Sequence, residues 1–185
     1  MPSEGKTEAW YETVVRVLKD NDVSLVCYVP DNVMSPLIRL VEADPYFTTV
    51  CPAREEEAIG ILSGAWMAGL RGIVLMQTSG FATLANVLAS LSVPYQIPVV
   101  MMISERGALG DFQLGQAIVC HTLKPVMTAL GIENFNIQEP DHVEFVVEKM
   151  VQQAFLTRGQ AAIVLSPLLT KRGAALPKQT LLLPQ

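Results

Sequence analysis

Residues 51–65 read CPAREEEAIGILSGA, and this stretch decides the fold. A strand-like apolar run ends at Cys51, and the segment from Arg54 to Ala58 then opens a helix. One face of that helix carries small and apolar residues: Ala58, Leu62, Ala65 and Gly69. Such a face packs tightly on a sheet, so Glu55 should lie at the carboxyl end of a strand, where α/β proteins keep their chemistry. A plainer interpretation is also open, in which the glutamates are first-turn acids that the helix dipole favours.

The alternation of apolar strand and helix continues along the chain. Apolar runs predict strands at 23–29, 47–51, 72–77, 98–103, 135–137 and 161–165. Helices are predicted from a cap at Thr7 and at 36–41, 54–70, 81–91, 116–130 and from Pro140 onward. Continuous apolar strands separated by helices are typical of a parallel sheet buried on both faces. The sequence therefore predicts an α/β fold of about six parallel strands with helices on both faces. We expect one domain at 1–168 and a C-terminal tail at 169–185.

The composition narrows the class of protein. The chain has 185 residues, of which 50% are hydrophobic and 17% charged, and its net charge is −5. The lysines and arginines are scattered, whereas nucleic-acid binding needs them clustered, so no nucleic acid partner is expected. The sequence shows neither a signal segment nor an apolar run of membrane-spanning length, so we expect no membrane association and a cytoplasmic protein.

The cysteines and the apolar surplus indicate the environment and the assembly. Cys27, Cys51 and Cys120 are widely spaced within apolar runs, which favours reduced core thiols over a disulfide framework or a metal site. Eight methionines and the high apolar fraction exceed what a monomer of this size usually needs. A large partner interface is therefore expected.

In a parallel sheet, the loops at the carboxyl ends of the strands meet at one rim. Here these loops are 30–33, 52–55, 77–81 and 104–115. The turn Gln77-Thr78-Ser79-Gly80 offers hydroxyls, an amide and backbone N–H groups to a polar ligand, although Ser79 taken alone also fits a plain helix N-cap. His121 follows the glycine-rich loop and is a candidate site residue or a structural histidine, whereas His142 is expected to be solvated.

Several familiar motifs are absent from the sequence. No Gly-x-Gly-x-x-Gly follows the first strand, and no P-loop motif or Gly-x-Ser-x-Gly occurs. The glutamate triplet has no histidine or aspartate at helical spacing, so no metal ligands are assigned. These absences argue against a dinucleotide-binding domain, a P-loop enzyme and a serine hydrolase.

Several segments together resemble the pyrimidine-binding domain of thiamine-diphosphate-dependent 2-oxoacid decarboxylases, and most closely the phosphonopyruvate and sulfopyruvate decarboxylases. Those segments are the Glu55 helix with Ala58 and Gly64, the turn 77–80, and Asn86 on the next helix. The turn 29–32 looks like that branch's Val-Pro-Asp-Ser, and residues 111–113 are weakly similar to the Asp-x-Phe-Gln of acetohydroxyacid synthases. The resemblance covers about residues 8–168.

The resemblance implies roles for individual residues. A carboxyl group at Glu55 would hydrogen-bond the pyrimidine N1′ of thiamine diphosphate and promote its imino tautomer. Thiamine diphosphate would be bound by Glu55, Pro30, Thr78, Ser79, Gly80 and Asn86, and Gln113 and His121 would join Glu55 in catalysis. Arg54 and Arg106 would pair with a sulfonate or phosphonate, since guanidinium suits tetrahedral oxyanions; either arginine also fits a surface ion pair.

The chain departs from the family in one respect that bears on its partner. The Gly-Asp-Gly and downstream Asn that hold Mg²⁺ and the diphosphate are absent, and Gly110-Asp111 lies in the wrong loop. The resemblance therefore implies an alpha subunit that needs a beta subunit carrying the diphosphate half of the site with Mg²⁺. Its expected substrate is 3-sulfopyruvate, with phosphonopyruvate as the alternative. A non-catalytic module of the same fold that binds a partner is the other interpretation.

Overall fold

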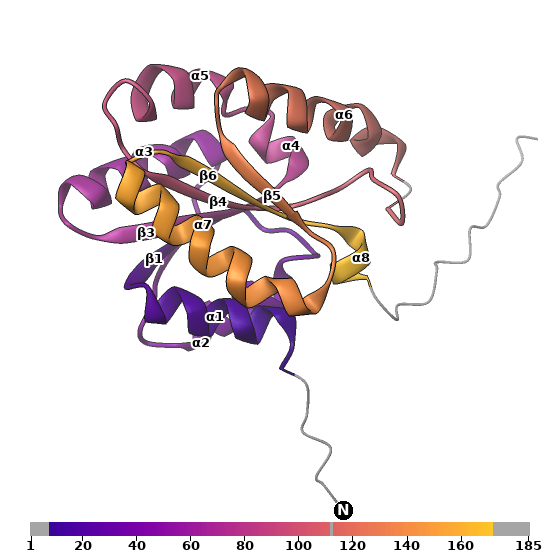
Figure 1. Cartoon of the computed structure of the whole chain (residues 1–185), viewed down its shortest axis with the longest axis horizontal. Helices are drawn as coiled ribbons and strands as arrows, with labels where there is room; N and C mark the ends of the chain where they lie inside the picture. Colours follow the sequence, from indigo (N-terminus) through magenta and orange to yellow (C-terminus); the bar gives the residue numbers. More distant parts are fainter. Residues whose placement is uncertain (1–7, 112, 172–185) are drawn as a thin grey trace, which may run out of the picture.

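The computed structural model describes residues 8–111 and 113–171, which form six parallel strands between helices (Figure 1). The sheet order is β2-β1-β3-β4-β6-β5, with every neighbouring pair parallel. The strands are β1 (Val23–Tyr28), β2 (Thr48–Val50), β3 (Arg71–Gln77), β4 (Val99–Ser104), β5 (Glu133–Ile137) and β6 (Gln160–Leu165). All six predicted strands and the predicted parallel α/β architecture are confirmed.

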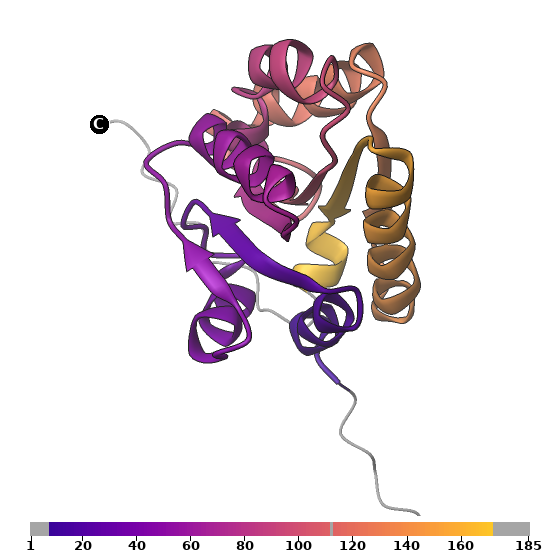
Figure 2. The same cartoon turned by 90° about the vertical axis from the view of Figure 1, so that its left-hand side faces the viewer.

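Helices cover both faces of the sheet, as Figures 1 and 2 show. One layer contains α1 (Trp10–Asp20), α2 (Ser35–Ala43) and α7 (Val143–Thr157), and the other contains α3 (Glu55–Met67), α4 (Thr78–Phe81), α5 (Ala85–Val87) and α6 (Leu114–Ala129). Side chains alternate along each strand, so Ile73 and Leu75 pack on the first layer while Val74 and Met76 pack on the second. This alternation of buried residues explains why the strands are apolar throughout.

The predicted helix 81–91 differs from the structure. A short helix, α4, begins three residues earlier, at Thr78, and a π-helix at Leu88–Ser92 follows α5. Two side-chain hydroxyls donate hydrogen bonds to backbone carbonyls in this segment: Thr83 Oγ1 to Gly80 O, and Ser90 Oγ to Asn86 O. Such local bonds compete with regular helical bonds, and they accompany the division of this segment into α4, α5 and the π-helix.

The chain termini and the cysteines depart from expectation in smaller ways. The predicted cap at Thr7 lies outside the described residues, and α1 instead begins after Ala9, whose N–H donates to Glu12 Oε2. The 169–185 tail begins inside the short helix α8 (Pro167–Thr170), and residues 172–185 lie outside the described part. All three cysteines are free, but only Cys27 is buried, and Cys51 is exposed because it follows an edge strand.

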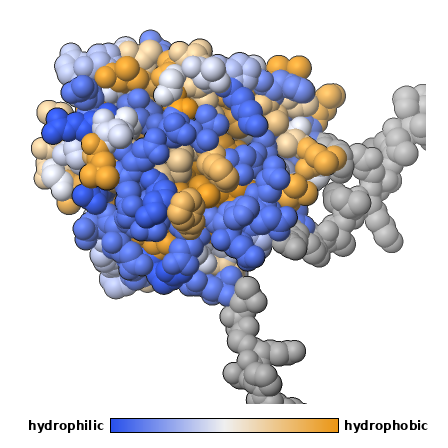
Figure 3. All heavy atoms as spheres, in the orientation of Figure 1, coloured by the Kyte–Doolittle hydropathy of each residue, from blue (hydrophilic) through white to orange (hydrophobic). Residues whose placement is uncertain are grey.

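Apolar side chains also gather on the surface. Leu109, Leu114 and Ile118 are 74–92% exposed at the end of the loop after β4 and on the first turns of α6. Orange atoms gather near the upper right edge of Figure 3, on the side where α6 begins in Figure 1. Within residues 8–111 and 113–171, no helix has the length and hydropathy that a membrane span needs.

Candidate functional site

Helix α3 begins at Glu55, and its first three residues are glutamates with different contacts. Glu57 Oε2 accepts a hydrogen bond from the Ala53 N–H at 3.0 Å, and Glu56 Oε1 pairs with Arg54 Nη2 at 2.9 Å on the surface. The Arg54 hydrogen bond lowers the pKa of Glu56. The plainer interpretation of first-turn acids therefore accounts for Glu56 and Glu57. Glu57 accepts a backbone N–H next to the helix start, and both negative charges are favoured by the positive end of the helix dipole.

The Glu55 side chain instead lies on Gly80 of α4. A Cβ atom at Gly80 would be 2.1 Å from Glu55 Oε1, 2.5 Å from Cδ and 2.7 Å from Cγ. The carboxylate therefore occupies the space that any other residue at position 80 would fill. The start of α3, which follows β2, therefore meets α4, which follows β3. Glu55 and Gly80 are 25 residues apart in the sequence.

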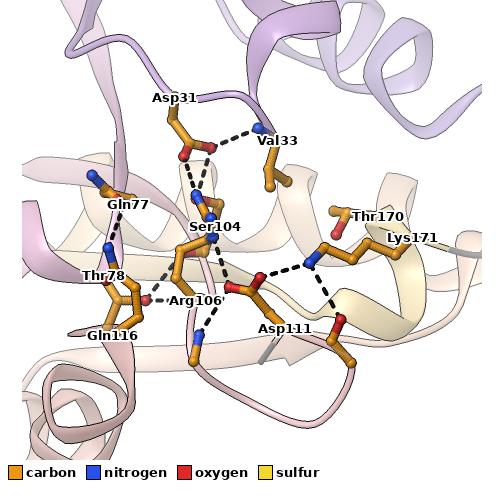
Figure 4. Close-up of polar contacts among 12 residues, drawn as sticks. Asp31, Val33, Gln77, Thr78, Ser104, Arg106, Asp111, Gln116, Thr170 and Lys171 are labelled. Atoms are coloured by element: carbon orange, nitrogen blue, oxygen red, sulfur yellow. Dashed lines mark hydrogen bonds and ion pairs between the residues drawn. The ribbon is translucent and has the colours of Figure 1, made fainter. Parts of the chain in front are cut away.

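Arg106, in the loop after β4, forms the centre of a buried ionic network (Figure 4). Its Nη1 lies 2.9 Å from Asp31 Oδ2, and its Nε lies 2.8 Å from Asp111 Oδ2. Asp31 Oδ1 also accepts hydrogen bonds from the Val33 N–H and from Ser104 Oγ. Because the guanidinium pairs with two carboxylates and each carboxylate also accepts neutral hydrogen bonds, the network offsets the cost of removing these groups from water.

Asp111 extends this network to the protein surface. Its Oδ1 lies 2.7 Å from Lys171 Nζ, just after α8, and its Oδ2 accepts the Gly107 N–H. Burial alone would raise the pKa of Asp111, but hydrogen bonds from Lys171, Arg106 and Gly107 outweigh it and lower that pKa to about 2. Gly107 has φ +80, and a Cβ there would lie 2.5 Å from the Gln116 backbone, so only glycine permits this loop to pack on α6.

The turn after β3 is fixed to the same network by Thr78. Its Oγ1 donates to Ser104 O at 3.0 Å and accepts the Arg106 backbone N–H at 2.9 Å. Beside it, Gln116 Nε2 donates to Gln77 Oε1 at 3.3 Å, while the buried Gln116 Oε1 has no partner among the described residues. The loops at 30–33, 77–81 and 104–115 therefore converge as predicted, and the Glu55–Gly80 contact adds the loop at 52–55.

Some of the predicted site residues are buried, and others are exposed at the surface. Glu55, Thr78 and Gly80 lie together, but the Thr78 side chain is fully buried and its hydroxyl is used within the protein. Arg106, predicted to bind the substrate, is buried and paired with two carboxylates. Ser79 is half-buried, and the remaining candidates are exposed at the surface: Pro30, Arg54, Asn86, Gln113 and His121. Within residues 8–111 and 113–171, no hydrogen bond or ion pair joins Gln113 or His121 to Glu55.

Sequence reasoning did not find Asp31, Ser104 or Lys171 as members of the network. Asp31 follows Pro30 after a buried strand, and its position at a strand end was the signal that could have identified it. Lys171 carried no comparable signal, because it follows the last strand by six residues in a segment without periodicity. No group of three or more His, Cys, Asp or Glu in the described ranges could hold a metal ion.

The fold is shared with a solved enzyme. The match is to 2-oxoglutarate:ferredoxin oxidoreductase from Magnetococcus marinus, with a TM-score of 0.68 and 11% identity over 88% of this chain and 29% of that one. No family model matches the sequence. This likeness shows that the six-stranded parallel α/β fold is shared with part of that enzyme.

Sequence relatives identify the family. The chain is 32% identical to sulfopyruvate decarboxylase subunit alpha of Methanocaldococcus jannaschii, over 69% of this chain and 76% of the relative. It is 31% identical to the subunit alpha of Methanothermobacter thermautotrophicus, over 83% of this chain and 93% of that relative. The sulfopyruvate decarboxylase of Methanosarcina acetivorans is 26% identical over 84% of this chain but only 40% of its own length. This chain belongs to the family of sulfopyruvate decarboxylase alpha subunits.

Proposed function

We propose that this chain is the pyrimidine-binding subunit of a thiamine-diphosphate-dependent decarboxylase that converts 3-sulfopyruvate to sulfoacetaldehyde and CO₂. The observation that carries the proposal is the Glu55 carboxylate resting on Gly80 where the strand-end loops meet. Membership of the sulfopyruvate decarboxylase alpha family supports the substrate, and the resemblance of the Glu55 helix and the turn 77–80 to thiamine-diphosphate-dependent decarboxylases supports the cofactor.

The residues at this rim suit the pyrimidine end of the cofactor. Glu55 is half-buried, and its carboxylate lies in a space left by the missing Cβ of Gly80. Within residues 8–111 and 113–171, neither Glu55 oxygen accepts a hydrogen bond from the protein, so the carboxyl group is available to share a proton with a ring nitrogen. Thiamine diphosphate, when bound, supplies the electron sink for the loss of CO₂.

The other residues of the rim would bind and orient the cofactor and the substrate. Ser79 and Gly80 lie in α4, and we propose that Pro30, in the loop after β1, and Asn86, on α5, complete the binding surface. Arg54 is exposed beside Glu55 and is the arginine that we assign to the sulfonate, because a guanidinium pairs with tetrahedral oxyanions. Gln113 and His121 are proposed to reach the substrate from the loop after β4 and from α6.

We further propose that the active site forms with a second polypeptide. The Gly-Asp-Gly and downstream Asn that would hold Mg²⁺ and the diphosphate are missing from residues 1–185. Only 40% of the Methanosarcina acetivorans relative corresponds to this chain, which leaves most of that protein for a further part. The exposed apolar patch of Leu109, Leu114 and Ile118 borders the rim and offers the partner a contact surface.

The test replaces Glu55 with glutamine and measures CO₂ release in the complex reconstituted with a candidate beta subunit. Glutamine keeps the size of the side chain but cannot share a proton, so Glu55→Gln should lower the rate by roughly 10²–10⁴-fold. Glu57→Gln is the matched control, because Glu57 lies in the same turn and, within the described part of the chain, its side chain bonds to the Ala53 N–H rather than facing Gly80. Its rate should stay within about twofold of the unmodified complex.

The substrates and the binding measurement separate the alternatives. Sulfopyruvate and phosphonopyruvate are assayed in parallel, and a higher kcat/KM for phosphonopyruvate would transfer the assignment to that substrate. Near-normal turnover by Glu55→Gln would contradict the role of Glu55. A complex that binds thiamine diphosphate but decarboxylates neither substrate would favour a non-catalytic module of the same fold.

A further inference from the structure

We propose that Arg106 is a positioning residue, which fixes the turn after β3 through Thr78 and thereby holds the Glu55 carboxylate in place. This inference rests on the proposed function, since it concerns the carboxylate that we assign to the cofactor. It also replaces the sequence-based role of Arg106 in binding the substrate. Three contacts connect Arg106 to Glu55: the buried ion pairs, the Thr78 hydroxyl and the contact between Gly80 and Glu55.

The first contact fixes the Arg106 side chain. Its two pairing nitrogens point to carboxylates from different loops, Asp31 after β1 and Asp111 after β4 (Figure 4). The Arg106 side chain is 10% exposed, and those of Asp31 and Asp111 are 2% and 3% exposed. With both carboxylates buried, neither can turn to water, so the planar fork of the guanidinium sets the distance between the two loops.

The second contact passes from Arg106 to the turn after β3. When the guanidinium is fixed, the Arg106 backbone N–H lies 2.9 Å from Thr78 Oγ1, and the same hydroxyl donates to Ser104 O at 3.0 Å. Thr78 is the first residue of α4 and is fully buried. Its hydroxyl therefore joins α4 both to the end of β4 and to the loop that Arg106 holds.

The third contact passes from α4 to Glu55. Gly80 lies two residues beyond Thr78 in the same short helix, directly beneath the Glu55 carboxylate. Because this contact is already close, a shift of α4 by a few tenths of an ångström changes where the carboxylate can lie. Arg106 thus acts on Glu55 through protein contacts alone and does not touch a ligand.

Two variants, Thr78→Val and Arg106→Lys, each remove one of the contacts between Arg106 and Glu55, and Thr78→Ser is the rescue variant. Thr78→Val keeps the shape of the side chain and removes the hydroxyl, whereas Thr78→Ser keeps the hydroxyl. Arg106→Lys keeps the charge but has one nitrogen, which cannot pair with both carboxylates in the observed geometry. The matched control is Thr13→Val, because Thr13 is a buried threonine on α1 whose hydroxyl bonds Glu8 and the Ala9 carbonyl.

Two measurements are made on each variant. Amide hydrogen exchange of the unliganded chain reports the order of residues 79–82, and kcat, KM and the Kd of thiamine diphosphate are measured in the reconstituted complex. For Thr78→Val and Arg106→Lys, exchange in 79–82 should become at least about tenfold faster. The kcat should fall by about 10–100-fold, with KM and Kd within about threefold. Thr78→Ser should recover most of the loss, and Thr13→Val should reproduce neither effect.

The outcomes separate this inference from the proposed function. If Arg106→Lys speeds exchange only in the loop 105–111 and leaves 79–82 unchanged, Arg106 holds its own loop alone and the inference is overturned. An equal loss of kcat in Thr13→Val would reduce the effect to general instability and also overturn it. If Glu55→Gln proves fully active, the proposed function fails, but the exchange in 79–82 still decides whether Arg106 fixes the turn.

Discussion

Replacing Gly80 with alanine tests the contact on which the account of Glu55 depends. The new Cβ would lie 2.1 Å from Glu55 Oε1, and real Cβ contacts are essentially never shorter than 3.0 Å. The carboxylate must therefore move by about 1 Å, and a misplacement of this size can cost on the order of 10²-fold in rate. The flexible glutamate can swing aside and alanine favours helix, so the free energy of unfolding should change by only about 1 kcal/mol.

The assay compares Gly80→Ala, Glu55→Gln and the double variant in the reconstituted complex. If alanine acts by displacing Glu55, the double variant should be hardly slower than Glu55→Gln alone, because both changes remove the same interaction. Gly60→Ala is the control for stability: no atom lies within 4 Å of a Cβ there, so the added methyl should stabilise α3 by about 0.5–1 kcal/mol. Independent, multiplicative losses in the double variant would show that alanine at position 80 acts by a route other than Glu55.

Two further predictions concern titratable groups away from Glu55. The folded-state pKa of Asp111 is about 2, below its unfolded value, so its stabilising effect is complete above about pH 4 and is lost as the pH falls towards 2. In urea unfolding, the advantage of the unmodified chain over Asp111→Asn should shrink by about 2 kcal/mol across that range, and parallel curves would contradict this. Burial raises the pKa of the Cys27 thiol to about 11, so at pH 8 a thiol reagent should label exposed Cys51 well before Cys27. Mass spectrometry follows the order in which the cysteines are labelled. Labelling of Cys27 before Cys51 would contradict the burial of Cys27.

The strands were predictable because each one carries its own signal. Runs such as 72–77 are apolar on both sides, and this pattern arises only where helices cover both faces of the sheet. The start of α3 at Glu55 was predictable for a similar local reason. The break between α4 and α5 was not, since residues 81–91 contain no glycine or proline that would mark it.

The ionic network illustrates what local patterns cannot predict. Arg106 and its partner Asp31 are 75 residues apart, and the sequence shows both only as charged residues in loops. The sequence offered Arg106 as a residue that binds the substrate or pairs at the surface, and the buried pairing depends on how the ends of β1 and β4 come together. For Glu55, by contrast, the strand-end position is visible in the sequence, whereas its contact with Gly80, 25 residues further on, was not predicted.

We propose that this chain carries the pyrimidine half of a cofactor site and that a second polypeptide completes it. The most direct test is calorimetric titration of thiamine diphosphate with Mg²⁺ into the purified chain, with and without the candidate beta subunit. We expect no Mg²⁺-dependent binding by the chain alone and binding once the two chains are mixed. Tight Mg²⁺-dependent binding by the chain alone would contradict the account.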